Sequence, residues 1–169
     1  MSDLIKYLNN VLDFCNSNHT KKSIKCSSLQ AKIATQHLLV ISKNLKTKLE
    51  LDESKYDSSV SFGSGYFPKV PWVAITIKGK KVSNSLSVCI CFAKEGHGFV
   101  AGAMFSEEKK EGKYKTMTRE NQFIDLLGGS SRTNYTNKFV NPKDFYINKF
   151  NEQDVLDHLK SSLKLLNEY

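Results

Sequence analysis

Residues suited to binding gather in one short stretch of the chain, Ser61–Ile75. It holds the only tryptophan, two of the three prolines and a Gly-x-Gly pair. Glycine permits positive φ and close approach, and proline fixes φ and removes a donor, so we expect a loop of defined shape. Trp72, in the apolar run that follows, could stack on a nucleobase or be a core residue. The chemistry favoured here is recognition, and the alternative is an ordinary turn that leads into a strand.

Catalytic patterns are scarce in this chain. There is no Gly-x-Ser-x-Gly, no His-Glu-x-x-His and no Gly-x-x-x-x-Gly-Lys-Ser/Thr. Glu111-Gly112-Lys113 matches half of a metal-dependent nuclease motif, but no preceding strand supplies an aspartate, which favours a chance match. Cys89 and Cys91 form C-x-C, which is not the spacing of a zinc knuckle. We therefore expect no enzyme, no metal and no cofactor, and the cysteines are expected to be small buried thiols.

The charge of the chain indicates a polyanionic partner. The formal net charge is +8, which favours nucleic acid, an acidic protein or a membrane surface without separating them. Between Asp57 and Glu95 every charged residue is basic. The basic residues that we expect to contact phosphates are Lys69, Lys78, Lys80, Lys81, Arg132 and Lys138.

Apolar spacing predicts helices at both ends of the chain. Residues 3–15 and 28–45 show helical periodicity, the second with a stripe of Leu29, Ile33, His37, Val40, Ile41 and Leu45. Thr118 is a candidate cap for a helix over 119–127, and Asn151 for one over 152–167.

The middle of the chain predicts an antiparallel sheet. Strands are expected at 60–62, 70–77, 86–92 and 99–105, with 49–59 as a connection. Short links between successive strands favour a meander. The fold class is therefore α+β, a single domain with a curved, mainly antiparallel sheet flanked by helices. Its parts are a helical region 1–50, the sheet and pocket region 58–150, and the C-terminal helix 151–169.

Apolar runs and the N-terminal residues indicate in which cellular compartment we expect the protein. No apolar run approaches the roughly 18 residues of a membrane span. The first residues lack the features of a signal peptide, so we expect a cytoplasmic setting, no membrane contact and an isolated domain that is monomeric.

The stretch Ser61-Phe62-Gly63-Ser64-Gly65-Tyr66-Phe67-Pro68-Lys69-Val70-Pro71-Trp72-Val73-Ala74-Ile75 resembles a known signature. It is similar to Ser-Phe-Gly-x-Gly-x-Phe-x-x-Ile/Val-Pro-Trp-x-Ala of the N-terminal DNA-binding domain of McrB, the GTPase subunit of restriction systems that depend on modified cytosine. The resemblance is strongest over 61–92 and is weak over the first sixty residues.

The resemblance implies roles for individual residues. Members of the family flip a modified base, such as 5-methylcytosine, out of duplex DNA into a pocket. Trp72 and Tyr135 would be its aromatic walls, and Ser87 and Cys91 would lie near the cytosine 5-substituent. The finger loop, Gly63, Ser64, Gly65 and Tyr66, would enter the space that the base leaves.

The resemblance also implies partners and leaves alternatives. The partners would be an AAA+ GTPase domain and a nuclease subunit of a phage-defence complex. Family members can carry larger side chains at Ser64, Ser87 and Cys91, so the preferred modification stays open. The alternatives are a module that reads an unmodified DNA sequence or RNA, a small nuclease that uses Glu111 and Lys113, and an adaptor for an acidic protein.

Overall fold

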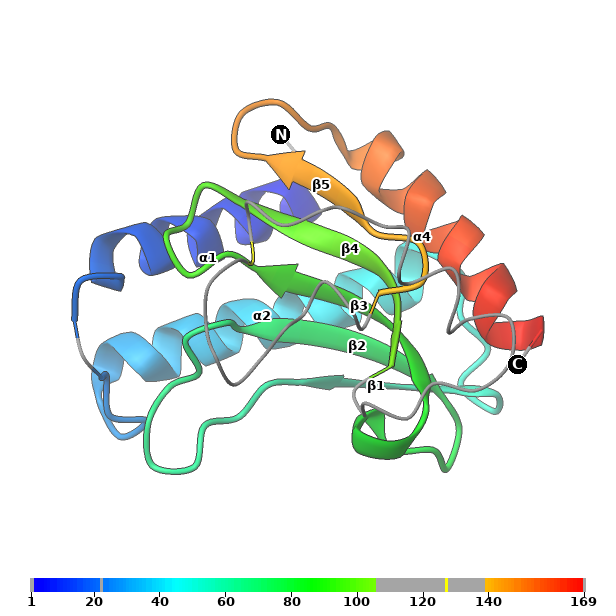
Figure 1. Cartoon of the computed structure of the whole chain (residues 1–169), viewed down its shortest axis with the longest axis horizontal. Helices are drawn as coiled ribbons and strands as arrows, with labels where there is room; N and C mark the ends of the chain where they lie inside the picture. The colour runs from blue at the N-terminus through cyan, green and yellow to red at the C-terminus, as the bar shows by residue number, and fades with distance from the viewer. Residues whose placement is uncertain (1, 22, 106–126, 128–138, 169) are drawn as a thin grey trace.

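The computed structural model describes residues 2–21, 23–105, 127 and 139–168. Three helices pack on one five-stranded antiparallel sheet whose strands lie side by side in chain order (Figure 1). The helices are α1 (Asp3–Asn18), α2 (Leu29–Lys48) and α4 (Glu152–Glu168), with a 3-10 turn η1 (Val82–Asn84). The strands are β1 (Tyr56–Val60), β2 (Trp72–Ile77), β3 (Leu86–Phe92), β4 (Gly98–Phe105) and β5 (Lys143–Tyr146). The predicted α+β class is confirmed.

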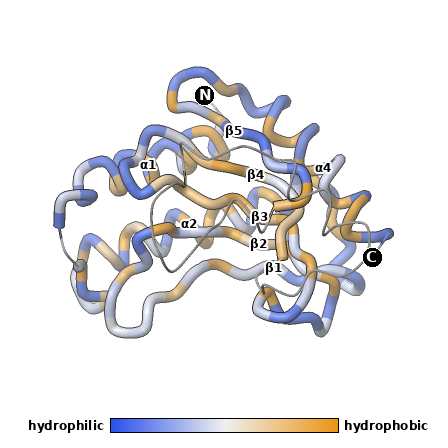
Figure 2. The backbone as a smooth tube through the Cα atoms, in the orientation of Figure 1, coloured by the Kyte–Doolittle hydropathy of each residue, from blue (hydrophilic) through white to orange (hydrophobic). Residues whose placement is uncertain are grey.

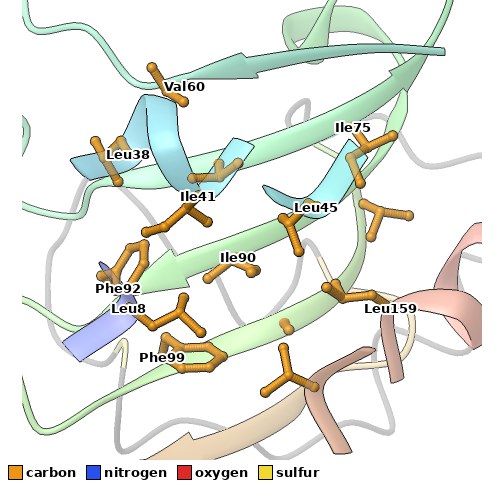
Figure 3. Close-up of a cluster of buried hydrophobic side chains, with 14 of the residues drawn as sticks. Leu8, Leu38, Ile41, Leu45, Val60, Ile75, Ile90, Phe92, Phe99 and Leu159 are labelled. Carbon is orange, nitrogen blue, oxygen red and sulfur yellow. The ribbon is translucent and has the colours of Figure 1, made fainter. Parts of the chain in front are cut away.

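One face of the sheet carries the main core. Alternate residues of β2, β3 and β4 meet α1, α2 and α4 there, with Leu8, Leu38, Ile41, Ile90, Phe92 and Phe99 at the centre (Figure 3). α2 packs on β1 and β2, whereas α4 packs on β3 and β4. The tube of β3 and β4 is strongly hydrophobic (Figure 2). Both strands are buried along their whole length, which is the pattern of a sheet covered on both faces.

Helix caps and ends follow the sequence closely. Ser2 and Ser28 accept hydrogen bonds from the backbone N–H groups of Ile5 and Ala31. At α4, the side-chain oxygen Oδ1 of Asn151 accepts from the Asp154 N–H at 2.9 Å, as the pattern predicted. Each cap satisfies a donor that the helix leaves unpaired.

The predicted stripe of α2 is wrong in its first half. Leu29 and Ile33 are 73% and 47% exposed, whereas Ala31, Ala34 and Leu38 are buried. Both sides of this helix carry apolar residues, so periodicity alone did not identify the side that meets the sheet.

Two strands differ from their predicted positions. β1 occupies 56–60 instead of 60–62, within the region predicted to be a connection. β5 was not predicted, because its four residues, Lys143-Asp144-Phe145-Tyr146, lack an apolar run. Contacts with other elements stabilise β5, because it pairs with β4 and Phe145 stacks on Phe99 with ring centroids 5.1 Å apart. The helix predicted over 119–127 lies outside the described residues except for Leu127.

Polar side chains fasten α4 to β4. The Asn141 side chain accepts from the Ala103 N–H at 2.7 Å and donates to the Ser162 hydroxyl at 2.9 Å. His158 Nε2 lies 3.0 Å from the Ala101 carbonyl oxygen. A carbonyl only accepts, so this nitrogen carries the proton of the neutral ring.

Stability should fall as the solution is acidified, in part through His158. Burial, only partly offset by the backbone groups of Ala101 and Asn141, lowers the pKa of His158 below 6.5. A lowered pKa in the folded state means that the unfolded chain binds the proton first, so stability is lost as pH falls below 6.5. Burial also lowers the pKa of His37, so His158→Gln should flatten this dependence only partly. Thermal unfolding of both proteins between neutral and mildly acidic pH measures it, and parallel profiles would contradict the assignment.

Among the helices of the described residues, none has the length and apolar character needed to cross a bilayer.

Candidate nucleic-acid interface

Three of the residues proposed for a base pocket, Trp72, Ser87 and Cys91, lie on the second face of the sheet, opposite α1, α2 and α4. Trp72 at the start of β2 is paired directly with Cys91 of β3. Ala74 is paired with Cys89, and Cys89 with Gly102 of β4. Side chains on one face of paired strands are neighbours, so Trp72 and Cys91 lie side by side on this face.

Small side chains line this second face beyond the tryptophan. Ser87 lies on the same face as Cys91, four residues earlier on β3. Its hydroxyl donates to the Met104 carbonyl at 3.3 Å and lies 3.2 Å from Cys89 Sγ. Because a hydroxyl has only one proton to donate, the Cys89 thiol is the donor in the second contact. Desolvation by burial raises the pKa of Cys89 to about 12. The thiol therefore stays neutral and is unsuited to nucleophilic chemistry.

The pocket residues are covered in this conformation. Ser87 and Cys91 are both 0% exposed, and Trp72 is half-buried. Leu127 and Phe139 belong to the same apolar cluster, with Trp72 at its edge. A base would reach Cys91 only after covering side chains move, and Trp72 is both a packing residue and partly accessible.

The finger loop is anchored to the linker between α1 and α2. The Cys26 N–H donates to the Gly65 carbonyl at 3.0 Å, and the Phe67 N–H donates to the Ile24 carbonyl at 2.7 Å. A Cβ on Gly63 would lie 1.5 Å from the Tyr66 carbonyl oxygen, so only glycine fits there. Gly65 has a φ of 85°, a conformation that glycine adopts without strain. The predicted loop of defined shape is confirmed.

Two hydrogen bonds fix Ser61, two residues before the finger loop, to the start of β2. The Ser61 hydroxyl accepts from the Trp72 N–H at 2.9 Å, and the Ser61 N–H donates to the Trp72 carbonyl at 2.9 Å. Ser61 is 2% exposed. The chain that enters the finger loop is therefore held directly beside Trp72.

Two aromatic rings project from the loop into solvent. Phe62 and Tyr66 are 69% and 52% exposed. Tyr66 was predicted as part of the finger loop, whereas Phe62 was not assigned a role. An aromatic residue directly before a Gly-x-Gly turn was the available signal, because such a turn gives its ring little to pack against.

The turn between β2 and β3 carries the predicted basic residues, and they are not equivalent. Lys78 Nζ lies 2.8 Å from the Glu53 carbonyl and 3.8 Å from Asp57. Lys80 and Lys81 are exposed and form no ion pair within the described residues. The Lys81 carbonyl instead accepts from the Ser85 hydroxyl at 2.6 Å, which shapes the turn. Lys80 and Lys81 are thus better placed to meet phosphates than Lys78.

The finger loop and the basic turn lie at opposite ends of β2. The strand has 6 residues, so the two ends are about 17 Å apart at roughly 3.3 Å per residue. That length matches about five nucleotide steps of one DNA strand. Lys69 is exposed on the loop side, so positive charge is present at both ends.

Several predicted site residues lie outside the described residues. These are Tyr135, Arg132 and Lys138, together with Glu111 and Lys113 of the alternative nuclease motif. Within the part of the chain that is described, no group of three or more His, Cys, Asp or Glu side chains could hold a metal ion.

Comparisons with known proteins give no family assignment. No model of a known protein family matches the chain, and no curated protein sequence matches it either.

Proposed function

We propose that this domain binds duplex DNA that contains a modified cytosine, flips that base, and holds it against Trp72 and Cys91. The observation that carries the proposal is the pairing of Trp72 with Cys91 on the face opposite α1, α2 and α4, between the finger loop and the basic turn. Base extrusion costs a few kcal/mol, which only a complementary pocket recovers. The domain acts as a reader and does no catalysis of its own.

The finger loop supplies the group that takes the place of the flipped base. Ser64 is too small to fill the gap, but Phe62 and Tyr66 flank it and expose their rings. Proteins that distort duplex DNA commonly insert such apolar wedges between bases. The backbone hydrogen bonds of the loop to Ile24 and Cys26 hold its conformation when a ring inserts between bases.

The wider setting follows from the same resemblance. The partners are a GTPase domain and a nuclease subunit that cuts after this domain has found its target. All four cysteines are thiols, which suits the reducing cytoplasm in which restriction takes place.

The test is a binding panel on duplexes of one sequence that differ only at one cytosine. The substituents at the 5-position of that cytosine are hydrogen, methyl, hydroxymethyl and a bulkier group. The affinities of all duplexes are measured at one stated salt concentration. We expect at least one modified duplex to bind more tightly than the unmodified one, with 2-aminopurine opposite or beside the site reporting extrusion. Equal affinity for all duplexes would reject base flipping and favour a sequence reader. Magnesium-dependent cutting that Glu111→Ala abolishes would favour the nuclease, and binding to acidic protein without competition by DNA would favour the adaptor.

Lys80→Ala should weaken binding to every duplex by the same factor. Lys80 is exposed on the turn after β2 and is not among the residues assigned to the base pocket, so we expect it to contribute through phosphate alone. The slope of log affinity against log salt is negative, and the loss of one phosphate contact makes it about 0.9 less steep. Titrations of the modified and unmodified duplexes at several salt concentrations measure both effects. Lys160→Ala on α4 is the charge-matched control, and a change in the ratio of the two affinities would contradict a purely phosphate role.

A further inference from the structure

A cavity opens at the C-terminal end of α1. It lies between the C-terminal end of α1, the linker before α2, the residues just after the finger loop and the turn between β3 and β4. Its volume is about 60 Å³, room for about four to six water-sized groups. None of the described residues assigned to the base pocket lines it, and of the described phosphate contacts predicted above only Lys69 does, so it is distinct from the base pocket.

The inner wall of the cavity is aromatic and apolar. Phe14 of α1 and Phe67 meet edge to face, with ring centroids 5.0 Å apart. Ile24 and Pro68 complete this wall, and Phe67 is only 8% exposed. Such a surface suits the face or edge of a flat ring, whose burial it favours.

The rim of the cavity is basic and is built from three separate segments. Lys21, Lys69 and Lys94 all line it. Two acids adjoin lining residues in sequence, Asp13 beside Phe14 and Glu95 beside Lys94, and neither lines the cavity. Burial and, to a smaller extent, Glu95 raise the pKa of Cys15, so the Glu95 carboxylate lies close by. The lining residues include three lysines and no acid, so the rim is positive and favours a ligand with two negative charges over one with a single charge.

The end of α1 does not cancel this charge. A helix C-terminus carries a partial negative charge on its unpaired carbonyls. Here the Phe14 carbonyl accepts from the Asn18 side chain at 2.8 Å, and the Asn18 carbonyl accepts from the Lys21 N–H at 3.1 Å. His19 Nδ1 lies within hydrogen-bonding distance of the Asn16 carbonyl oxygen, at 2.6 Å. With these carbonyls satisfied, the lysines dominate the rim.

The residues that line the cavity are suited to binding a ligand and not to nucleophilic catalysis. Burial raises the pKa of Cys15 to about 12, so the thiol in the wall is neutral and is not a nucleophile. We propose that this cavity is a nucleotide site, in which one side of a base enters against Phe14 and Phe67 while the phosphate stays among Lys21, Lys69 and Lys94. The nucleotide is either free or the phosphorylated end of a nucleic-acid strand. The site does not depend on base flipping at Trp72.

The test is a titration of the full chain, monitored through the NMR chemical shifts of its backbone amides. The probes are cytidine and adenosine 5′-monophosphate, the matching nucleosides, inorganic phosphate, and a short single strand with or without a 5′-phosphate. We expect the monophosphates to shift the amides of 14–24, Phe67, Lys69 and Lys94, and the nucleosides and inorganic phosphate to bind at least tenfold more weakly. Tighter binding of the 5′-phosphorylated strand than of the monophosphate would identify a strand end as the source, and the reverse would identify a free nucleotide.

Two variants separate the cavity from general surface charge. Ser23 lines the cavity and is exposed, so Ser23→Trp should fill the space and weaken monophosphate binding at least tenfold. Ser161→Trp, an exposed position on α4, is the matched control and should leave binding unchanged. Lys21→Glu with Lys94→Glu should abolish binding without altering discrimination between modified and unmodified duplexes.

Three results would overturn the proposal. They are the absence of shifts in these segments at millimolar monophosphate, equal binding of inorganic phosphate and monophosphate, and full binding by Ser23→Trp. None of them bears on the duplex panel, so this site and the reader function fail or stand separately.

Discussion

Replacing Gly63 by alanine is expected to lower the melting temperature by roughly 6–12 °C, because overpacking of about 3 kcal/mol translates into about 2–4 °C per kcal/mol in a chain of this size. The new Cβ would lie 1.5 Å from the Tyr66 carbonyl oxygen and 2.8 Å from Cys26 Sγ. The first of these neighbours is backbone, which cannot turn away as a side chain can. The loop must therefore open and give up its bonds to Cys26 and Ile24.

Gly65→Ala provides the matched comparison. It has no heavy atom within 4 Å of its Cβ position but a φ of 85°, so its cost is only the strain of the left-handed conformation, about 1 kcal/mol. Thermal unfolding of both variants separates a steric cost from a conformational one. A Gly63→Ala protein that melts within 2 °C of the parent would contradict the described loop, since roughly 1 kcal/mol or less would then separate them.

Local patterns were sufficient for much of the fold. β3 has the bounds that its apolar run predicted, Leu86–Phe92, and the α4 cap is the predicted Asn151. In these cases the residues of the element itself decide its structure. β5 shows the opposite case, because Asp144 and Phe145 become a strand only through the β4 edge and the ring of Phe99. Sequence periodicity does not contain that information.

The candidate sites divide in the same way. The finger loop was predictable because its glycines and prolines restrict the backbone locally. The meeting of Trp72 with Cys91 depends on strand register, which the pattern did not specify. The cavity at the end of α1 was missed, since Phe14, Phe67 and Lys94 are far apart in sequence and only the fold brings them together.

Trp72→Ala is expected to remove the preference for modified duplexes while salt-sensitive background binding remains. Stacking of a base on an aromatic ring is worth about 1–3 kcal/mol, so the ratio of affinities should fall by roughly 5- to 150-fold. The side chain is half-buried against the cluster that contains Cys91, so the same change also removes packing and should lower stability.

A second variant separates stacking from packing. Trp72→Leu keeps apolar volume beside Cys91 but has no flat ring, and the backbone bonds to Ser61 are retained because they use main-chain atoms of residue 72. We expect Trp72→Leu to recover most of the stability that Trp72→Ala loses, yet to discriminate no better. Melting temperatures and the duplex panel, run on the same samples, measure both properties. If Trp72→Leu binds modified DNA as the parent does, Trp72 is a core residue only, and the base is held elsewhere or not flipped at all.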